Sequence, residues 1–579
     1  MRILLTAINA KYIHSNLAVY SLKANAKEWE ADVELAEFTI NNQKDDILEE
    51  LYRRQPQVLC FSCYIWNLDY VEEISREFHK LCPDVPIWVG GPEVSYEVEA
   101  FLKENPHITG VMIGEGEETF QEVCQHYIRK ELELKDIHGL GFREGEKVIF
   151  TPSRSLMDMS KIPFCYDQMQ DFSNRIIYYE SSRGCPFSCS YCLSSVDKKL
   201  RFRDLSLVKQ ELQFFIDQKV PQIKFVDRTF NCHHDHAMEI WKYIKDHDNG
   251  VTNFHFEVSA DLINEDELQL METMRPGLIQ LEIGVQSTNE ITIKEIHRTM
   301  KLDRLKEVVR RVQSMGNIHQ HLDLIAGLPY EDYETFQRSF DEIYTLKPNQ
   351  LQLGFLKVLK GSYMYDHAAE YEIVYHDRPP YEVLSTKWLS YSDVLAIKQV
   401  EEMLEVYYNS GQFEVTMKLL EKLFDSAFIM FLRLGEFYQK RGYFGMSHSR
   451  IRRCEILLEF LEDSNFMGIQ GLEEMIKEAL IFDLYYRENC KSRPEWACSM
   501  TEFKHMTRFF CPKGKMSHVE PFHYHFPEKD QWSIDTLPKR QEKPLWVLFH
   551  YDRRDPLDHQ AEIEYVQEET WQQSEQKKS

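Results

Sequence analysis

The sequence has no long apolar run, because no stretch approaches the ~20 residues that a membrane-spanning helix needs. The short apolar run at its start, M-R-I-L-L-T-A-I, lacks a basic region of any length and a small-residue cleavage site. We therefore interpret this run as a buried strand. Both absences favour a cytoplasmic protein without a membrane partner, in which thiols stay reduced.

Positive charge is scarce, since 68 Lys and Arg stand against 94 Asp and Glu and leave a net charge of −26. An acidic chain is repelled by phosphate backbones, so a nucleic-acid partner is disfavoured and would need a local basic patch. The best such patch is K-K-L-R-F-R at residues 198–203, which we interpret as a solvated loop. The 13 cysteines are an odd number, which argues against a pure disulfide framework.

A chain of 579 residues is too long for one hydrophobic core, and its residue patterns indicate several domains of an α/β protein. Residues 1–135 alternate β-branched apolar runs with amphipathic stretches, which predicts a Rossmann-like parallel sheet with helices on both faces. Residues 136–172 look like a small strand pair and a linker. Residues 173–365 repeat a strand-helix unit six times and predict a partial (β/α)6 barrel. Helical periodicity predicts a mostly helical domain over 366–560, and the polar tail 561–579 is expected to be disordered.

Two glycine-bearing turns follow predicted strands of the first domain: V-G-G-P-E at 89–93 and I-G-E-G-E-E at 113–118. Neither matches G-x-G-x-x-G, so the dinucleotide-binding fingerprint is absent. Glycine allows close backbone approach by a large ligand, and ligands of such sheets lie at the carboxyl ends of the strands. These turns therefore mark a candidate binding edge.

Three cysteines stand within eight residues, spaced C-x3-C-x2-C: Cys185, Cys189 and Cys192. A disulfide would leave one thiol over, and a structural zinc site usually takes four protein ligands, whereas no fourth Cys or His lies within the motif. Three thiolates can hold an iron–sulfur cluster with one iron left open for chemistry. The motif follows the first predicted barrel strand, at the rim where barrel enzymes carry their active sites.

The segment C-P-F-S-C-S-Y-C resembles the cluster loop of the radical S-adenosylmethionine (SAM) enzymes. F-V-D-R-T-F, F-E-V-S-A, L-E-I-G-V-Q-S and D-L-I-A-G-L-P resemble the strand segments around SAM in that superfamily, and the resemblance covers roughly residues 175–365. It implies a [4Fe–4S] cluster and SAM as cofactors. The implied SAM-site residues are Tyr191, Asp227, Glu257, Ser259, Glu282 and Gln286.

The first domain resembles the cobalamin-binding module found ahead of many radical SAM barrels, through V-L-C-F-S-C-Y-I-W-N and the two glycine-bearing turns. The resemblance implies a corrin lined by Ser62, Gly90, Gly91, Glu93, Gly114 and Glu115. Many cobalamin proteins supply a lower-face histidine from D-x-H-x-x-G. Here K-Y-I-H-S-N-L lacks the Asp and the Gly, so we interpret His14 as structural and expect cobalamin without histidine ligation.

The resemblance implies an enzyme that cleaves SAM reductively and methylates an unactivated carbon of an unknown substrate, with an electron donor such as flavodoxin or ferredoxin. The residues identify no general base, and His321 and Asp323 are candidates only by location. Three alternatives stay open. They are a methylthiotransferase acting on tRNA or a ribosomal protein, a cobalamin-assisted rearrangement or cyclisation without methyl transfer, and a non-enzymatic redox or cobalamin sensor.

Overall fold

The computed structural model describes residues 1–166, 174–464, 466, 469, 471–500, 504–511, 516–526 and 540–566. The chain divides into two compact units. The first contains Met1–Gln320, Gly327–Asp332 and Gly354–Ser390, and the second contains His321–Ala326, Tyr333–Leu353 and the described residues from 391 onward. Within these ranges, no helix combines the length and the apolarity that crossing a bilayer would require.

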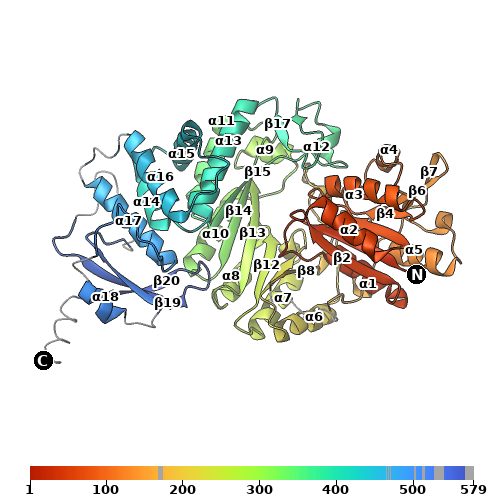
Figure 1. Ribbon diagram of the computed structural model, residues 1–579, viewed down its shortest axis with the longest axis horizontal. Coiled ribbons are helices and arrows are strands. Elements are labelled where there is room, and N and C mark those ends of the chain that lie inside the picture. The colour runs from red at the N-terminus through yellow and green to blue at the C-terminus, as the bar shows by residue number, and fades with distance from the viewer. Residues whose placement is uncertain are drawn as a thin grey trace. The chain divides into compact units, whose positions relative to one another are not determined.

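The first sheet has seven strands in the order β2-β1-β3-β4-β5-β6-β7 (Figure 1). The strands are β1 Ile3–Asn9, β2 Val33–Thr39, β3 Val58–Ser62, β4 Ile87–Gly90, β5 Gly110–Met112, β6 Leu140–Glu144 and β7 Lys147–Phe150. Strands β1 to β5 pair in parallel, which confirms the Rossmann-like sheet, and β6 and β7 add antiparallel. The strand pair expected inside 136–172 therefore extends the first sheet, because its apolar residues complete the core beside β5.

Helices cover both faces of this sheet: α1 Leu17–Asn25, α2 Lys44–Arg54, α3 Leu68–Leu81, α4 Val98–Glu104 and α5 Glu117–Arg129. Buried residues of α2, α3 and α4 share one core cluster with the strands, among them Ile47, Val71 and Phe101. Helices α1 and α5 pack against each other. The strand order changes direction between β1 and β3, and parallel sheets of this kind bind ligands at the carboxyl ends of the strands near that point.

The second sheet has six strands in the order β15-β14-β13-β12-β11-β8, as expected for a partial barrel (Figure 1). The strands are β8 Ile176–Tyr179, β11 Gln222–Phe225, β12 Asn253–Val258, β13 Ile279–Gln286, β14 His319–Ala326 and β15 Gln350–Phe355. The helices between them are α6 Leu205–Asp217, α7 His234–Asp246, α8 Glu265–Glu272, α9 Glu290–Glu295, α10 Leu302–Met315 and α11 Tyr333–Tyr344. The pairs β8–β11, β11–β12 and β12–β13 run parallel.

Alternation along the barrel strands separates an apolar face from a polar one. On β12, Phe254 and Phe256 are fully buried, whereas Glu257 points to the opposite face. On β13, every second residue from Ile279 is buried, which leaves Glu282 and Gln286 on the other face. The polar side chains of the first unit's barrel strands therefore share the face that the helices do not cover.

The loop that follows β1 lies along the outer side of β8. The amide of Ile176 donates to the carbonyl of Ile13 at 2.7 Å, and His14 forms a parallel bridge with Ile176. The hydroxyl of Ser15 donates to the carbonyl of Ile176 at 2.8 Å. His14 Nδ1 also lies 2.7 Å from the Tyr178 hydroxyl, which agrees with the structural role expected for this histidine.

The second unit is mostly helical after residue 390. Its helices are α13 Tyr391–Leu404, α14 Glu414–Leu420, α15 Ala427–Arg441, α16 Arg450–Asp463, α17 Leu472–Arg487 and α18 Lys504–Phe510. The strands β18 Ser517–Phe522, β19 Leu545–Arg554 and β20 Ala561–Val566 form an antiparallel sheet. The expectation of disorder from residue 561 is wrong for 561–566, because A-E-I-E-Y-V pairs with β19. Residues 567–579 lie outside the described residues.

Candidate active site

The three cysteines lie on a loop between two short antiparallel strands, β9 Ser182–Arg183 and β10 Arg201–Phe202. Gly184 opens the loop with φ +89°, and a Cβ there would lie 2.6 Å from the carbonyl oxygen of Lys199, so only glycine fits. The amide of Cys185 donates to the carbonyl of Asp197 at 3.0 Å. The backbone of the loop therefore closes on itself at its base.

Cys185 and Cys189 are buried and Cys192 is half-buried. Burial raises the pKa of the Cys185 thiol, and Cys192 and Cys189 raise it further. The Cys185 thiol therefore resists ionisation without a nearby cation, because a charged group is costly to bury unpaired. A bound iron would supply the missing positive charge, since metal binding displaces the thiol protons.

Arg298, which follows α9, reaches the cysteine loop, and no sequence pattern pointed to it. Its Nη1 donates to the Tyr191 hydroxyl at 3.1 Å and lies 3.8 Å from Cys189 Sγ, and its Nη2 donates to the carbonyl of Gly284. Its Nε is a buried donor without a hydrogen-bond partner among the described residues. The guanidinium thus links the cysteine loop to β13 and keeps one donor for a ligand.

Gln286, at the end of β13, has a left-handed backbone with φ +74° and a buried Oε1 that accepts no hydrogen bond among the described residues. A non-glycine residue in this conformation is strained, and such strain concentrates at functional sites. Together with Arg298 Nε, this acceptor remains unsatisfied until a polar ligand binds. Both atoms therefore fit a ligand such as SAM beside the cysteine loop.

Glu257 and Glu282 stand opposite each other on β12 and β13. Lys224 Nζ donates to Glu282 Oε2 at 2.7 Å, and His255 Nε2 lies 2.9 Å from the same oxygen. Although burial opposes it, these two partners hold the pKa of Glu282 well below its usual range. Burial and the charge of Glu282 raise the pKa of Glu257 to about 7. The two predicted carboxylates thus differ, one a fixed anion and the other able to exchange a proton near neutral pH.

Asp227 and Ser259 are engaged with the protein itself. Asp227 is fully buried and accepts hydrogen bonds from the amide of Ser181 at 3.0 Å and from the Ser181 and Ser182 hydroxyls at 2.6 Å. The hydroxyl of Ser259 donates to Asp261 at 2.8 Å. Asp227 therefore holds the segment that leads into the cysteine loop, a role that the resemblance does not indicate.

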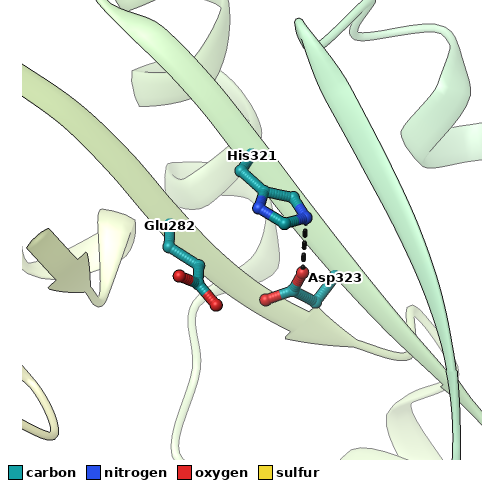
Figure 2. Close-up of side chains that lie close together, drawn as sticks. All are labelled: Glu282, His321 and Asp323. Atoms are coloured by element: carbon teal, nitrogen blue, oxygen red, sulfur yellow. Dashed lines mark ion pairs between the residues drawn. The ribbon is translucent and has the colours of Figure 1, made fainter. Parts of the chain in front are cut away.

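His321 and Asp323 lie on the same face of β14, because they are two positions apart on a strand. Figure 2 shows the ion pair between them, with His321 Nε2 at 3.2 Å from Asp323 Oδ1, and draws Glu282 of β13 as well. The pair can relay a proton only if a ligand reaches it.

The carboxyl edge of the first sheet carries the glycines expected to line a corrin. Gly91 has φ +120°, and a Cβ there would lie 2.4 Å from the carbonyl oxygen of Cys63, so the turn after β4 requires glycine. Gly114 has φ +79° with open space around its Cα. Gly90 closes β4, and Ser62 is buried at the end of β3.

Two aromatic rings that follow β3 were not singled out from the sequence. Tyr64 and Trp66 stack with centroids 4.4 Å apart and planes 6° apart, and Trp66 keeps 41% of its surface exposed. The indole N–H donates to the carbonyl of Ile8 at 3.1 Å. A flat, partly exposed ring that follows a strand of this sheet suits a large flat cofactor, so Trp66 fits cobalamin.

The carboxylates of the two turns are occupied by protein groups. Glu93 accepts a hydrogen bond from the Tyr381 hydroxyl, and Glu115 accepts bonds from Arg201 at 2.6 Å and from the amide of Met157 at 2.9 Å. The structure thus gives both residues partners other than the corrin that the resemblance implied.

The segment 198–203 matches the solvated loop that we expected only at Lys198 and Lys199, which are exposed, and not at its two arginines. The guanidinium of Arg203 is buried and pairs with Glu211 of α6 at 2.5 Å, and the Arg201 side chain is only 10% exposed. The two arginines pair with acidic residues, Arg201 with Glu115 and Asp197 and Arg203 with Glu211. Only the two lysines of this segment present their charge to solvent.

Comparison with known families gives three matches. Residues 3–124 match the B12 binding domain and residues 179–343 match the Radical SAM superfamily. The chain thus combines a B12-binding domain with a radical SAM domain. Residues 369–544 match a family described as a protein of unknown function, DUF4080, so the third matched region has no assigned role.

The relatives of this chain are distant. TokK of Streptomyces tokunonensis, a cobalamin-dependent radical SAM methyltransferase, is 24% identical over 306 residues, which are 49% of this chain and 44% of TokK. An uncharacterized methyltransferase of Pyrococcus horikoshii is 24% identical over 62% of this chain and 75% of its own length. An anaerobic magnesium-protoporphyrin IX monomethyl ester cyclase of Synechocystis is 23% identical over 54% of this chain and 63% of the cyclase. The chain thus spans less than half the length of TokK.

The solved structure of the cobalamin-dependent SAM radical enzyme OxsB, with aqua-cobalamin and SAM bound, has a TM-score of 0.58 to this chain. The sequence identity is 16%, over 83% of this chain and 78% of OxsB. The likeness shows a common fold, in which a parallel sheet is followed by a partial barrel.

Proposed function

We propose that the protein is an enzyme that cleaves SAM reductively at a [4Fe–4S] cluster and methylates an unactivated carbon of a substrate whose identity is unknown. The observation that carries the proposal is the cysteine loop. It presents three thiols and no fourth ligand within the motif, beside the unsatisfied Arg298 Nε and Gln286 Oε1. That arrangement supports a cluster with one iron open to a polar cofactor.

The bound groups supply the chemistry: the cluster with SAM supplies a carbon radical, and cobalamin supplies a methyl group. The cysteines would hold the cluster, and Arg298 would stabilise negative charge on it. Gln286 and Glu257 offer oxygens to the hydroxyl or amino groups of SAM. Trp66 and Tyr64 would exclude water from the corrin, which protects reactive species.

The methylthiotransferase alternative needs a second cluster in the first domain, on three dispersed cysteines. Cys60, Cys63 and Cys124 are buried in that domain's core, and burial raises the pKa of each thiol well above its usual range. Thiols packed as apolar residues make poor cluster ligands. This observation favours cobalamin over a second cluster.

Cyclisation without methyl transfer remains a second candidate, favoured by the similarity to the Synechocystis cyclase. Product analysis separates the two, because methylation adds a methyl group to the substrate and cyclisation removes hydrogen. We further propose a cytoplasmic location, where thiols stay reduced, and an electron donor such as flavodoxin or ferredoxin. A sensor would bind the same cofactors without turning SAM over.

The decisive experiment is anaerobic purification with iron, sulfide and cobalamin counted per chain. We expect one [4Fe–4S] cluster and one cobalamin, and 5′-deoxyadenosine on reduction with SAM. Cys185→Ala should lose the cluster, whereas the matched variant Cys82→Ala, a half-buried cysteine that follows α3 in the first domain, should keep it. Zinc in place of iron, or full iron retention in Cys185→Ala, would overturn the proposal.

A further inference from the structure

Two arginines flank the cysteine loop, and both reach the turn that follows β5. Arg183 lies on β9, immediately before the loop, and its Nη2 donates to Glu117 Oε1 at 2.5 Å. Arg201 lies on β10, immediately after the loop, and its Nη1 donates to Glu115 Oε1 at 2.6 Å. Arg183 Nη1 also lies 3.5 Å from Glu115. Glu115 thus contacts the arginines at both ends of the cysteine loop.

This group of four side chains is shielded from solvent. Arg183 and Arg201 are 17% and 10% exposed, and Glu115 and Glu117 are 16% and 6% exposed. Although burial favours the neutral acid, the Arg183 guanidinium lowers the pKa of Glu117 below its usual range. Charges this deep hold a defined geometry, because removal of one partner leaves the other buried and unpaired.

Each end of the group is anchored further into its own domain. Glu117 accepts a hydrogen bond from the Ser21 hydroxyl of α1 at 3.1 Å. Arg201 Nη2 donates to Asp197 at 2.8 Å, and the carbonyl of Asp197 accepts the amide of Cys185 at 3.0 Å. A continuous path of hydrogen bonds therefore runs from the turn after β5 to the first cysteine.

We propose that Arg183, Arg201, Glu115 and Glu117 form a brace that sets the distance and orientation between the cobalamin edge and the cysteine loop. The inference rests on the proposed function, because a fixed separation matters only if both cofactors bind. Glu115 and Glu117 are then positioning residues that act through the two arginines, and Glu115 need not touch the corrin.

The brace matters because a radical generated beside the cysteines and a methyl group held at the first sheet must meet the same substrate carbon. A displacement of about 1 Å between reacting groups costs roughly 100-fold in rate. Loosening the brace should therefore leave cofactor binding and SAM cleavage in place while the two steps lose their coupling.

The test uses the full-length holoprotein with Glu115→Gln and Arg201→Lys. The matched control is Glu118→Gln, since Glu118 follows Glu117 directly on α5 but pairs with Arg154 at 3.1 Å instead of with Arg183 or Arg201. Pulsed EPR on protein with a reduced cluster and cob(II)alamin measures the distance distribution between the two paramagnets. Amide hydrogen exchange reports the stability of residues 184–200.

Both brace variants should keep native iron and cobalamin contents, broaden the distance distribution and speed exchange of residues 184–200 about tenfold. Glu118→Gln should match the native protein in both measurements. Native distance distributions and exchange rates in both brace variants would overturn the brace. Absence of iron or cobalamin from the native protein would instead overturn the proposed function, and exchange would still report on the brace.

Discussion

Arg298 places a guanidinium nitrogen 3.8 Å from the sulfur of Cys189, across 109 positions of sequence. Burial opposes its charge, yet Tyr191 and Cys189 raise the pKa of Arg298 above its usual value, so the group stays a cation beside the cysteines. A fixed cation next to a cluster ligand stabilises the more negative, reduced state. This relationship gives the first prediction.

Arg298→Gln should lower the midpoint potential of the cluster by roughly 60 mV, because a charge-assisted hydrogen bond contributes about 1.5 kcal/mol and a one-electron couple converts this at 59 mV per factor of ten. Redox titration followed by EPR measures the shift. Arg304→Gln on α10, which removes an arginine paired with Glu307, is the control. An unchanged potential at native iron content would contradict the assignment.

Asp227→Asn should destabilise the segment that leads into the cysteine loop by about 2 to 4 kcal/mol. A buried carboxylate with three donors would be replaced by an amide whose NH2 group must face one of them. Amide exchange at β8 and β9 measures the loss. Asp204→Asn, at the N-cap of α6, should change little, because Asn caps helices as well as Asp. Equal effects of both substitutions would refute a special role for Asp227.

Glu257→Gln should flatten the pH dependence of stability between about 4.5 and 7. Burial and Glu282 raise the pKa of Glu257 from 4.5 to about 7, so the folded protein keeps a proton that the unfolded chain releases. The contribution of Glu257 to the free energy of unfolding is therefore complete below about pH 4.5. It falls by about 3 kcal/mol as the pH rises to 7. Denaturant titrations across this range measure the slope.

The control for the Glu257→Gln substitution is Glu265→Gln on the surface of α8. Hydrogen bonds from Arg311 and Gln269 lower the pKa of Glu265, so it titrates below the window in question. The slope between pH 4.5 and 7 should stay as in the native protein. A slope that persists in Glu257→Gln would place the titrating group elsewhere.

Trp66→Ala should weaken retention of cobalamin about tenfold while leaving the iron content unchanged, because burial of one large ring under a ligand contributes about 1.5 kcal/mol or more. Equilibrium dialysis with cobalamin measures the change. Tyr52→Ala removes an aromatic residue of α2 that is 51% exposed, and it should bind cobalamin normally. Equal binding by both variants would place the corrin away from Trp66.

Local patterns were enough to predict the parallel sheets, the glycine-dependent turns and the cysteine loop, because each depends on neighbours in sequence. Gly91 and Gly184 show why: their positive φ is dictated by the turn itself. The polar face of the barrel followed from strand alternation, which placed Glu257 and Glu282 together.

Long-range partners could not be predicted in this way. Asp227 and Glu115 are carboxylates, as expected of ligand-binding residues. However, Asp227 accepts a hydrogen bond from a residue 45 positions away and Glu115 from one 86 positions away. Arg298 stands in no motif, and only the fold brings it to Cys189. The sequence predicted β6 and β7 as a strand pair. It could not show that this pair joins β5, because that depends on which sheet has an edge strand nearby in the fold.

The pairing of residues 13–15 with β8 bears on how the barrel can be handled experimentally. Without the first domain, the amide and carbonyl of Ile176 would lose their partners, and the outermost barrel strand would become a template for β-sheet addition between copies. A fragment beginning at the barrel should therefore self-associate, and dissection of this protein is better attempted by point substitution than by truncation.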